Sequence, residues 1–278
     1  MHTPKSIVSV FHFRRPSGKM NFGDDVATEL IAKITQCETR WAPATQADVV
    51  AIGSIIQSFN SNGKSWETRW HRLFKKRQIV WGSGLIQPQK SYIKHADICA
   101  LRGPLTAKFL GLAKQTLPYG DPGVLFSKYF GAKTQSIEMG VVLHYSHQKK
   151  WKNLLKDYDN IKIILAEDEP SRVINSISQC RKIISSSLHG LIAADSFNIP
   201  NIYSQFDEPL KGKSFKFYDY ALGVEREPHN PKPIRNLKDF ENLLNNFHMH
   251  ASSANPEKIN CAAGRLEEVL LERLKDRM

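Results

Sequence analysis

The sequence predicts an α/β fold in which parallel strands alternate with helices. Short apolar runs of strand length alternate with amphipathic stretches of helical spacing along most of the 278 residues, a pattern typical of parallel α/β layers. The alternation pauses at the polar stretch 131–136 and then restarts, which indicates a boundary between two domains. Small or polar residues follow many of the apolar runs, as expected for loops at the ligand-binding edge of an open sheet.

The first half contains four predicted strands, at residues 7–11, 47–52, 78–81 and 97–101. A helix follows the first strand, and Asp24 or Asp25 is predicted to cap its start. A second helix begins at Pro104, because proline suits the first helical turn. The turns after these strands carry glycine together with serine, aspartate or proline, at Gly53-Ser54, Gly82-Ser83-Gly84, Gly103-Pro104 and Gly120-Asp121-Pro122-Gly123.

The second half contains strands at 139–144, 161–165, 182–184 and 201–203 and helices at 151–155 and 170–179, with closing helices at 236–247 and 257–275. The strand at 182–184 stops in three serines, Ser185 to Ser187, and helical spacing resumes at Leu188. A helix that starts there leaves backbone N–H groups free, which favours an anion at the turn. The other interpretation is an ordinary serine-capped helix with an exposed His189.

Composition narrows the class of protein. The net charge of +12 suits nucleic acid, an anionic membrane or phosphorylated ligands, but no zinc-finger, RNP or helix-turn-helix pattern is present, so we expect no nucleic-acid partner. The four cysteines are scattered singly, which argues against a zinc ribbon or a disulfide scaffold and favours a reducing cytoplasm. The N-terminus lacks a signal-peptide pattern, and no apolar run approaches the ~20 residues needed to cross a bilayer.

Two further features have alternative interpretations. Residues 65–77 form a basic amphipathic stretch with Trp66 and Trp70 on one face, which either packs on the core or contacts an anionic membrane interface. His144 and His147 have a spacing that brings two imidazoles together, but no third ligand accompanies them. We therefore predict no metal site and expect His144 to line a cleft.

A set of motifs in a characteristic order resembles the polysaccharide pyruvyltransferase family over about residues 6–222. The motifs are Asn21-x-Gly23-Asp24, Ala47-Asp48-Val49-Val50 before Gly53-Ser54, Trp81-Gly82-Ser83-Gly84, Arg102-Gly103-Pro104-Leu105-Thr106, Gly120-Asp121-Pro122-Gly123, Ser185-x-x-Leu188-His189-Gly190 with Ala193-Ala194 and Ile199-Pro200, and Lys216-Phe217-x-Asp219-Tyr220. The resemblance implies two Rossmann-like domains facing across a cleft, as in B-type glycosyltransferases. Residues 1–133 would form the acceptor side, 134–255 the donor side and 256–278 a C-terminal helix.

The resemblance also implies an activity. Pyruvate would pass from phosphoenolpyruvate, the co-substrate, to two hydroxyls of one sugar in a bacterial surface or exopolysaccharide precursor, giving a cyclic ketal and phosphate without a cofactor. The acceptor would be a sugar of a lipid-linked oligosaccharide, used in the cytoplasm at the inner face of the membrane, with residues 65–77 as the membrane contact. Two alternatives stay open: a nucleotide-sugar glycosyltransferase of the same architecture, and a non-catalytic protein that binds an anionic glycan.

The residue types suit this chemistry, because a carboxylate and a phosphate require cations and free amides. We expect His189 to act as acid/base or to stabilise the phosphate, and Arg102 to clamp the donor. Asp24 or Asp121 would orient the sugar hydroxyls, with helix capping as the alternative role of Asp24. Many family members carry arginine where this chain has Ser187, so Arg102, Lys216 or Arg181 would have to replace that cation. The predicted donor site is Ser185, Ser186, Ser187, Leu188, His189, Gly190, Lys216 and Arg102. The predicted acceptor site is Asn21, Gly23, Asp24, Ser83, Asp121 and His144.

Overall fold

The computed structural model describes residues 7–59, 77–91, 93, 96–275 and 277. These residues form two five-stranded sheets in which every strand pairing is parallel, so the α/β prediction is confirmed. All but the last residue of the basic stretch 65–77 lies outside the described residues. No helix in the described part of the chain is both long enough and apolar enough to cross a membrane.

Both sheets have the same strand order, which decides where their loops meet. The first sheet contains β1 (Ile7–Phe11), β2 (Glu38–Trp41), β3 (Val49–Ala51), β4 (Gln78–Trp81) and β5 (Ala96–Ile98) in the order β2-β1-β3-β4-β5. The second contains β6 (Met139–Leu143), β7 (Ile161–Leu165), β8 (Ile183–Ser185), β9 (Asn201–Phe206) and β10 (Lys232–Ile234) in the order β10-β9-β8-β6-β7. Each is a doubly wound sheet. The chain first adds a strand on one side of the starting strand and then continues on its other side, so the switch points lie between β1 and β3 and between β6 and β8.

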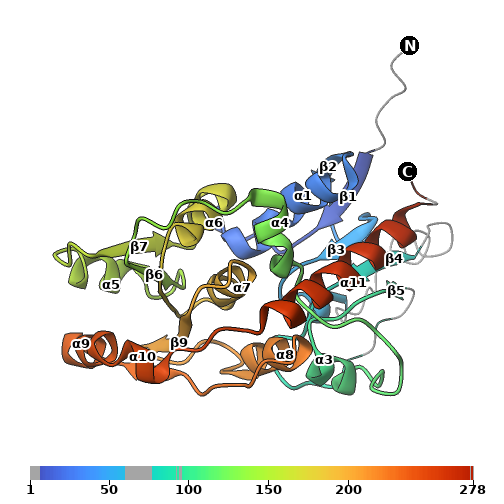
Figure 1. The fold of residues 1–278 in the computed structure, drawn as a ribbon. Coiled ribbons are helices and arrows are strands. Elements are labelled where there is room, and N and C mark those ends of the chain that lie inside the picture. The colour runs from blue at the N-terminus through green and yellow to red at the C-terminus, as the bar shows by residue number, and fades with distance from the viewer. Residues whose placement is uncertain (1–6, 60–76, 92, 94–95, 276, 278) are drawn as a thin grey trace, which may run out of the picture.

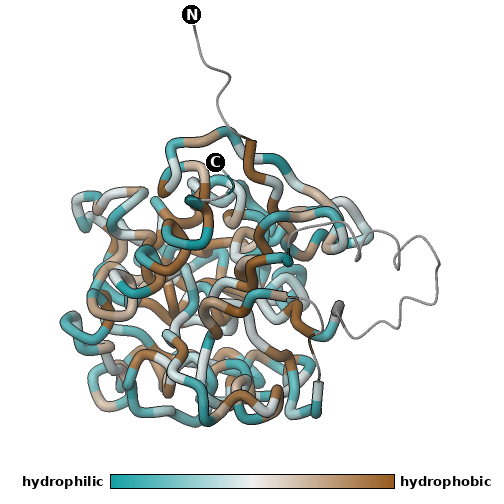
Figure 2. The backbone as a smooth tube through the Cα atoms, turned by 90° about the vertical axis from the view of Figure 1, so that its right-hand side faces the viewer, coloured by the Kyte–Doolittle hydropathy of each residue, from teal (hydrophilic) through white to brown (hydrophobic). Residues whose placement is uncertain are grey.

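Helices fill the space between the sheets and cover their outer faces (Figure 1). The helices between them are α1 (Phe22–Thr35), α4 (Phe126–Phe130), α6 (Pro170–Ser178) and α7 (Leu188–Ser196), whose apolar side chains share one core. The other helices are η1 (Ile56–Phe59), α3 (Pro104–Phe109), η2 (Pro122–Leu125), α5 (Gln148–Leu154), α8 (Phe215–Gly223), α9 (Leu237–Asn245), α10 (Phe247–His250) and α11 (Pro256–Leu274). Figure 2 shows the apolar segments gathered in the interior and hydrophilic segments at the periphery.

The chain ends by crossing back to the first sheet. Helix α11 follows the second half but lies along β4 and η2 of the first (Figure 1). The indole of Trp81 donates a hydrogen bond to the carbonyl of Leu266 at 2.8 Å, and Leu266 and Leu270 are fully buried in the shared core. The proposed boundary at 133/134 falls between α4 and β6, but α11 ties the two halves together.

Several elements differ from the sequence-based expectations. The edge strands β2 and β10 and helix α8 were not predicted, since their short polar or mixed sequences lack a clear apolar period. Helix α1 begins at Phe22, with Asn21 at its N-cap. Asp25 accepts a hydrogen bond from the Asn21 backbone N–H at 2.6 Å, so Asp25 rather than Asp24 supports the start of this helix.

Candidate active site

A cavity of about 720 Å³ lies between the carboxyl ends of the two sheets. Its wall comes mostly from the loops after β1, β3, β6 and β8, the four strands that flank the two switch points, together with the loop after β9 and helix α8. Open α/β sheets bind ligands at such points, and here the two switch points share one cavity. The residues that line it are Phe13, Asn21, Asp24, Ser54, Ile55, Gln57, Ile86, His144, Tyr145, Ser146, His147, Ser187, Leu188, His189, Asp207, Glu208, Pro209, Leu210, Lys211 and Lys216.

Asp24 is the buried carboxylate of this cavity. It lies in the first turn of α1, accepts a hydrogen bond from the Asn21 side chain, and is only 7% exposed. Burial raises the pKa of Asp24 to about 6, although His189, Asn21 and Lys216 act in the opposite direction. Gly53 makes room for it, because a Cβ there would lie 2.2 Å from Asp24 Oδ1. Asp24 therefore faces the cavity as a group that titrates near neutrality.

His189 comes from the other half and meets the start of α1. Its ring lies against Gly23, where a Cβ would be 1.8 Å from His189 Nδ1, and it makes an edge contact with Phe22 at 6.2 Å between ring centroids. Only glycine fits at position 23, because a side chain there would overlap the His189 ring. This close contact between the two halves holds the ring at the cavity wall.

The start of α7 differs from the predicted row of free amides. The Ser186 N–H donates to the carbonyl of Val142 at 3.1 Å, and the Ser187 N–H donates to Ser185 Oγ at 3.0 Å. The first-turn amides without an intrahelical acceptor therefore begin at Leu188 and extend to Gly190. Ser187 is the N-cap residue, but its hydroxyl makes no capping bond and lines the cavity.

Lys216 is the candidate cation at this helix end. It lies in the first turn of α8 and lines the cavity. Burial, together with the positive charge of Arg102, lowers the pKa of Lys216 to about 8, and Asp24 partly offsets this effect. Arg181 is excluded as the alternative, because it precedes β8 at the amino end of that strand, opposite the cavity, where it is exposed near Glu138.

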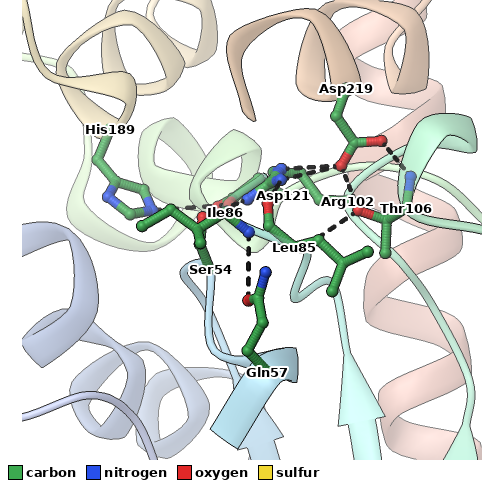
Figure 3. Close-up of polar contacts among 9 residues, drawn as sticks. All are labelled: Ser54, Gln57, Leu85, Ile86, Arg102, Thr106, Asp121, His189 and Asp219. Carbon is green, nitrogen blue, oxygen red and sulfur yellow. Dashed lines mark hydrogen bonds and ion pairs between the residues drawn. The ribbon is translucent and has the colours of Figure 1, made fainter. Parts of the chain in front are cut away.

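Arg102 is placed differently from the predicted donor clamp. Its side chain is fully buried and absent from the cavity wall. The guanidinium donates to Asp219 Oδ2 at 3.1 Å, to Ser54 Oγ at 2.8 Å and to the Leu85 carbonyl at 2.5 Å (Figure 3). Asp219 also accepts from the backbone and hydroxyl of Thr106. With its guanidinium engaged by these protein atoms, Arg102 contacts the described lining of the cavity only through Ser54.

Other predicted site residues lie behind the wall. Ser185 is buried and bonds to Ser187, and Gly190 packs on Ser185 and Val142. Ser186 Oγ accepts from the backbone N–H of His144 at 2.9 Å, which ties the loop after β6 to the loop after β8. Ser83 is fully buried, so it is not available as an acceptor contact. Asp121 is also fully buried and faces His189 instead of the cavity.

His144 lines the cavity as predicted from its position after a strand. Burial and the nearby positive charges of Lys216, His147 and Arg15 lower the pKa of His144 to about 3, so its ring is neutral at physiological pH. The His144 and His147 ring centroids are 5.9 Å apart. Within the described residues, no three histidine, cysteine or acidic side chains converge as a metal site.

Sequence reasoning missed part of the wall. Residues 207–211 follow β9 and reach the cavity, as do Phe13, Gln57 and Ile86. The loop after β9 was detectable in principle, because it follows a predicted strand of the second half. Phe13, Gln57 and Ile86 belong to no motif in the sequence, and an aromatic, amide or aliphatic side chain is usual in any loop, so nothing marks them as site residues.

Comparisons with known proteins agree with the motifs. A family model described as polysaccharide pyruvyl transferase matches residues 4–204. The chain is 30% identical over 210 residues to the uncharacterized protein L143 of Acanthamoeba polyphaga mimivirus, covering 69% of this chain and 68% of that protein. It is 31% identical over 160 residues to the succinoglycan biosynthesis protein ExoV of Rhizobium meliloti (strain 1021), covering 54% of this chain and 49% of that protein. The structure of E. coli ADP-heptose LPS heptosyltransferase II aligns with 98% of this chain and 99% of its own, at 11% identity and a TM-score of 0.31.

Proposed function

Because the chain belongs to the polysaccharide pyruvyl transferase family, we propose that it transfers pyruvate from phosphoenolpyruvate to two hydroxyls of one sugar in a surface-polysaccharide precursor. The product is a cyclic ketal, and phosphate is released. One observation carries the proposal: a single cavity joins an ammonium group, a helix start, a histidine and a carboxyl group that titrates near neutrality. That is the set of groups that a doubly anionic donor and two proton transfers require.

The donor binds at the start of α7, next to Lys216. Phosphoenolpyruvate carries a carboxylate and a phosphate, and both are stabilised by an ammonium group and by amides at a helix N-terminus. Lys216, with a pKa of about 8, is mostly cationic at neutral pH. It supplies the charge that arginine supplies where this chain has Ser187, and the Ser187 hydroxyl remains as an extra hydrogen-bond donor.

In the reaction, two sugar hydroxyls each lose a proton. A first sugar hydroxyl adds to C2 of phosphoenolpyruvate while C3 gains a proton, and the C2–O bond to phosphate then breaks. The second hydroxyl adds to C2 and closes the ketal. Of the two protons lost by the hydroxyls, one is matched by the proton that C3 gains to become a methyl group, and the other leaves with phosphate. We assign proton removal from the hydroxyls to His189 and proton delivery to Asp24, whose pKa of about 6 suits an acid near neutrality.

The acceptor sugar occupies the part of the cavity between Asn21 and the loop after β6. Tyr145 and Phe13 offer aromatic faces for a sugar ring, while Asn21 and His144 offer polar groups for its hydroxyls. We propose a lipid-linked oligosaccharide as acceptor, used at the inner face of the cytoplasmic membrane. The proposed membrane contact at 65–77 rests on sequence alone.

The test is phosphate release from phosphoenolpyruvate in the presence of galactose, mannose or glucosamine acceptors. We expect release only with both substrates, and an acceptor mass increased by one pyruvate less one water. His189→Ala should lower the rate by about 10²-fold or more. His248→Ala is the matched control, since His248 is exposed and does not line the cavity.

The outcome that contradicts the proposal is near-normal turnover of His189→Ala, or no release with any acceptor. A thermal shift with nucleotide sugars but not with phosphoenolpyruvate would instead favour a glycosyltransferase of the same architecture. Glycan binding without phosphate release would favour a binding protein.

A further inference from the structure

Two buried polar atoms without hydrogen-bond partners face each other behind the cavity wall. Asp121 Oδ2 and His189 Nε2 are 3.6 Å apart (Figure 3), and neither has another partner among the described residues. Buried polar atoms are normally paired, since an unpaired one costs about 1–3 kcal/mol. Here an acceptor and a potential donor point at each other across a gap slightly longer than a hydrogen bond. Catalytic hydrogen bonds are often this long before substrate binds and shorten in the complex.

The local fold fixes the Asp121 carboxylate. Asp121 caps the 3₁₀ helix η2, where its Oδ1 accepts from the Gly123 N–H at 3.0 Å. Helix η2 packs on α7, since the Ser196 hydroxyl donates to the carbonyl of Val124 at 2.9 Å. One carboxylate oxygen is thus held by the cap, and the other is left to face the histidine on the packed helix.

The histidine ring is held from its other side. Gly23 lies against the ring, so closely that a Cβ there would overlap Nδ1, and Phe22 contacts its edge. Asp121 itself is fully buried and does not reach the cavity. In the described part of the chain, His189 is the only basic side chain within ion-pair distance of Asp121, so no lysine or arginine neutralises this carboxylate.

We propose that Asp121 is the positioning residue of His189: it holds the ring with Nε2–H toward the carboxylate and leaves Nδ1 to exchange a proton with substrate. When His189 takes a hydroxyl proton, the buried carboxylate stabilises the imidazolium that forms. This role replaces the acceptor contact predicted for Asp121 from sequence, and it rests on the proposed function. A buried carboxylate that orients the histidine which removes a hydroxyl proton is the arrangement known from other acid/base sites.

Asp121→Asn separates this role from capping. The amide oxygen of asparagine still accepts from the Gly123 N–H, so η2 keeps its cap, but the NH₂ group now donates to Nε2 and favours the Nδ1–H tautomer. We expect kcat for phosphate release to fall by about 10²- to 10⁴-fold, with a change in the KM for phosphoenolpyruvate below about threefold. Glu169→Gln is the matched control: it makes the same carboxylate-to-amide change at an exposed helix cap, at the start of α6, where Glu169 accepts from the N–H groups of Ser171 and Arg172.

Two measurements test the pairing directly. Nitrogen-15 NMR of labelled histidine, recorded well above the ordinary pKa of histidine and assigned with His189→Gln, should show the Nε2–H tautomer in the unmodified protein and Nδ1–H in Asp121→Asn. In the His189→Gln background, Asp121→Asn should change kcat by less than about twofold, because a residue that acts through His189 has no effect without it.

An Nδ1–H tautomer in the unmodified protein overturns the proposal even where Asp121→Asn fails to fold. Full kcat in Asp121→Asn, or a loss that adds to that of His189→Gln, also overturns it. If the unmodified protein releases no phosphate with any acceptor, the proposed function fails, while the NMR spectrum still decides whether Asp121 and His189 are paired.

Discussion

Replacing Asp24 with asparagine should stabilise the protein, and only above a defined pH. The pKa of this carboxyl is raised from an ordinary value of 3.8 to about 6, chiefly by burial. Since one pKa unit corresponds to about 1.4 kcal/mol, ionised Asp24 destabilises the folded state by about 3 kcal/mol. The side chain is only 7% exposed, so solvent screening reduces this value little.

The sign follows from proton binding in the two states. Between pH 3.8 and about 6, folded Asp24 holds a proton that the unfolded chain has released. Stability therefore falls as pH rises through this window and reaches a plateau above it. Asparagine cannot ionise and can still accept from Asn21, so Asp24→Asn lacks this decline.

Urea unfolding followed by circular dichroism, repeated across this pH range, measures the effect. We expect the stability of Asp24→Asn relative to the unmodified protein to rise by about 3 kcal/mol between pH 3.8 and values above 6. Asp168→Asn, a substitution of an exposed carboxylate, should show no comparable rise. A stability difference that stays constant with pH would refute the reasoning, because Asp24 would then ionise as easily in the folded protein as in the unfolded chain.

Three further predictions concern the other residues of the site. Lys216→Met should raise the KM for phosphoenolpyruvate by about 10- to 100-fold, through loss of a charged hydrogen bond, and Lys216→Arg should restore part of it; an unchanged KM would remove Lys216 from the donor site. Arg102→Met should lower the free energy of unfolding by about 3–5 kcal/mol, because it leaves Asp219 buried without its ion pair; denaturant titration checks this, and a stable variant with a raised KM would return Arg102 to donor binding. Gly23→Ala should lower kcat by about 10²-fold, because its Cβ displaces the His189 ring, whereas Gly264→Ala, which meets no atom within 4 Å, should not.

The strand-end loops were predictable because parallel sheets place all their carboxyl ends on one edge. The turns at 21–24, 53–54 and 185–190 are predicted at the ligand-binding edge and His144 is predicted to line a cleft, and all of them contribute to the cavity wall. The order of the strands in each sheet could not be predicted from the sequence, so the sequence did not indicate which turns flank a switch point. The turns Gly82-Ser83-Gly84 and Arg102-Gly103-Pro104 therefore seemed equivalent to the others, but they lie behind the wall, with Ser83 and Arg102 fully buried.

Arg102 illustrates why residue type alone misleads. An arginine at a strand end predicts a ligand contact, because an arginine is almost never fully buried unless it is paired. Its partner is Asp219, 117 residues further along the chain, and only the packing of α8 on α3 brings them together. The same packing places Lys216, one helical turn before Asp219, at the cavity wall. Of the three cations that the sequence offered, Lys216 is therefore the one at the cavity wall, and the tertiary contact that selects it over Arg102 has no local signature in the sequence.

The site retains features that oppose stability, and these features mark the groups that we assign to chemistry. Asp24 is buried at a cost of about 3 kcal/mol when ionised, and Asp121 and His189 are buried within 3.6 Å without a complete hydrogen bond. A chain selected only for folding would replace such groups with apolar or fully paired ones. By contrast, Arg102 and Asp219 are fully paired, as expected of groups that serve the fold. The contrast between unpaired and paired buried charge therefore separates the reactive groups from the framework that holds them.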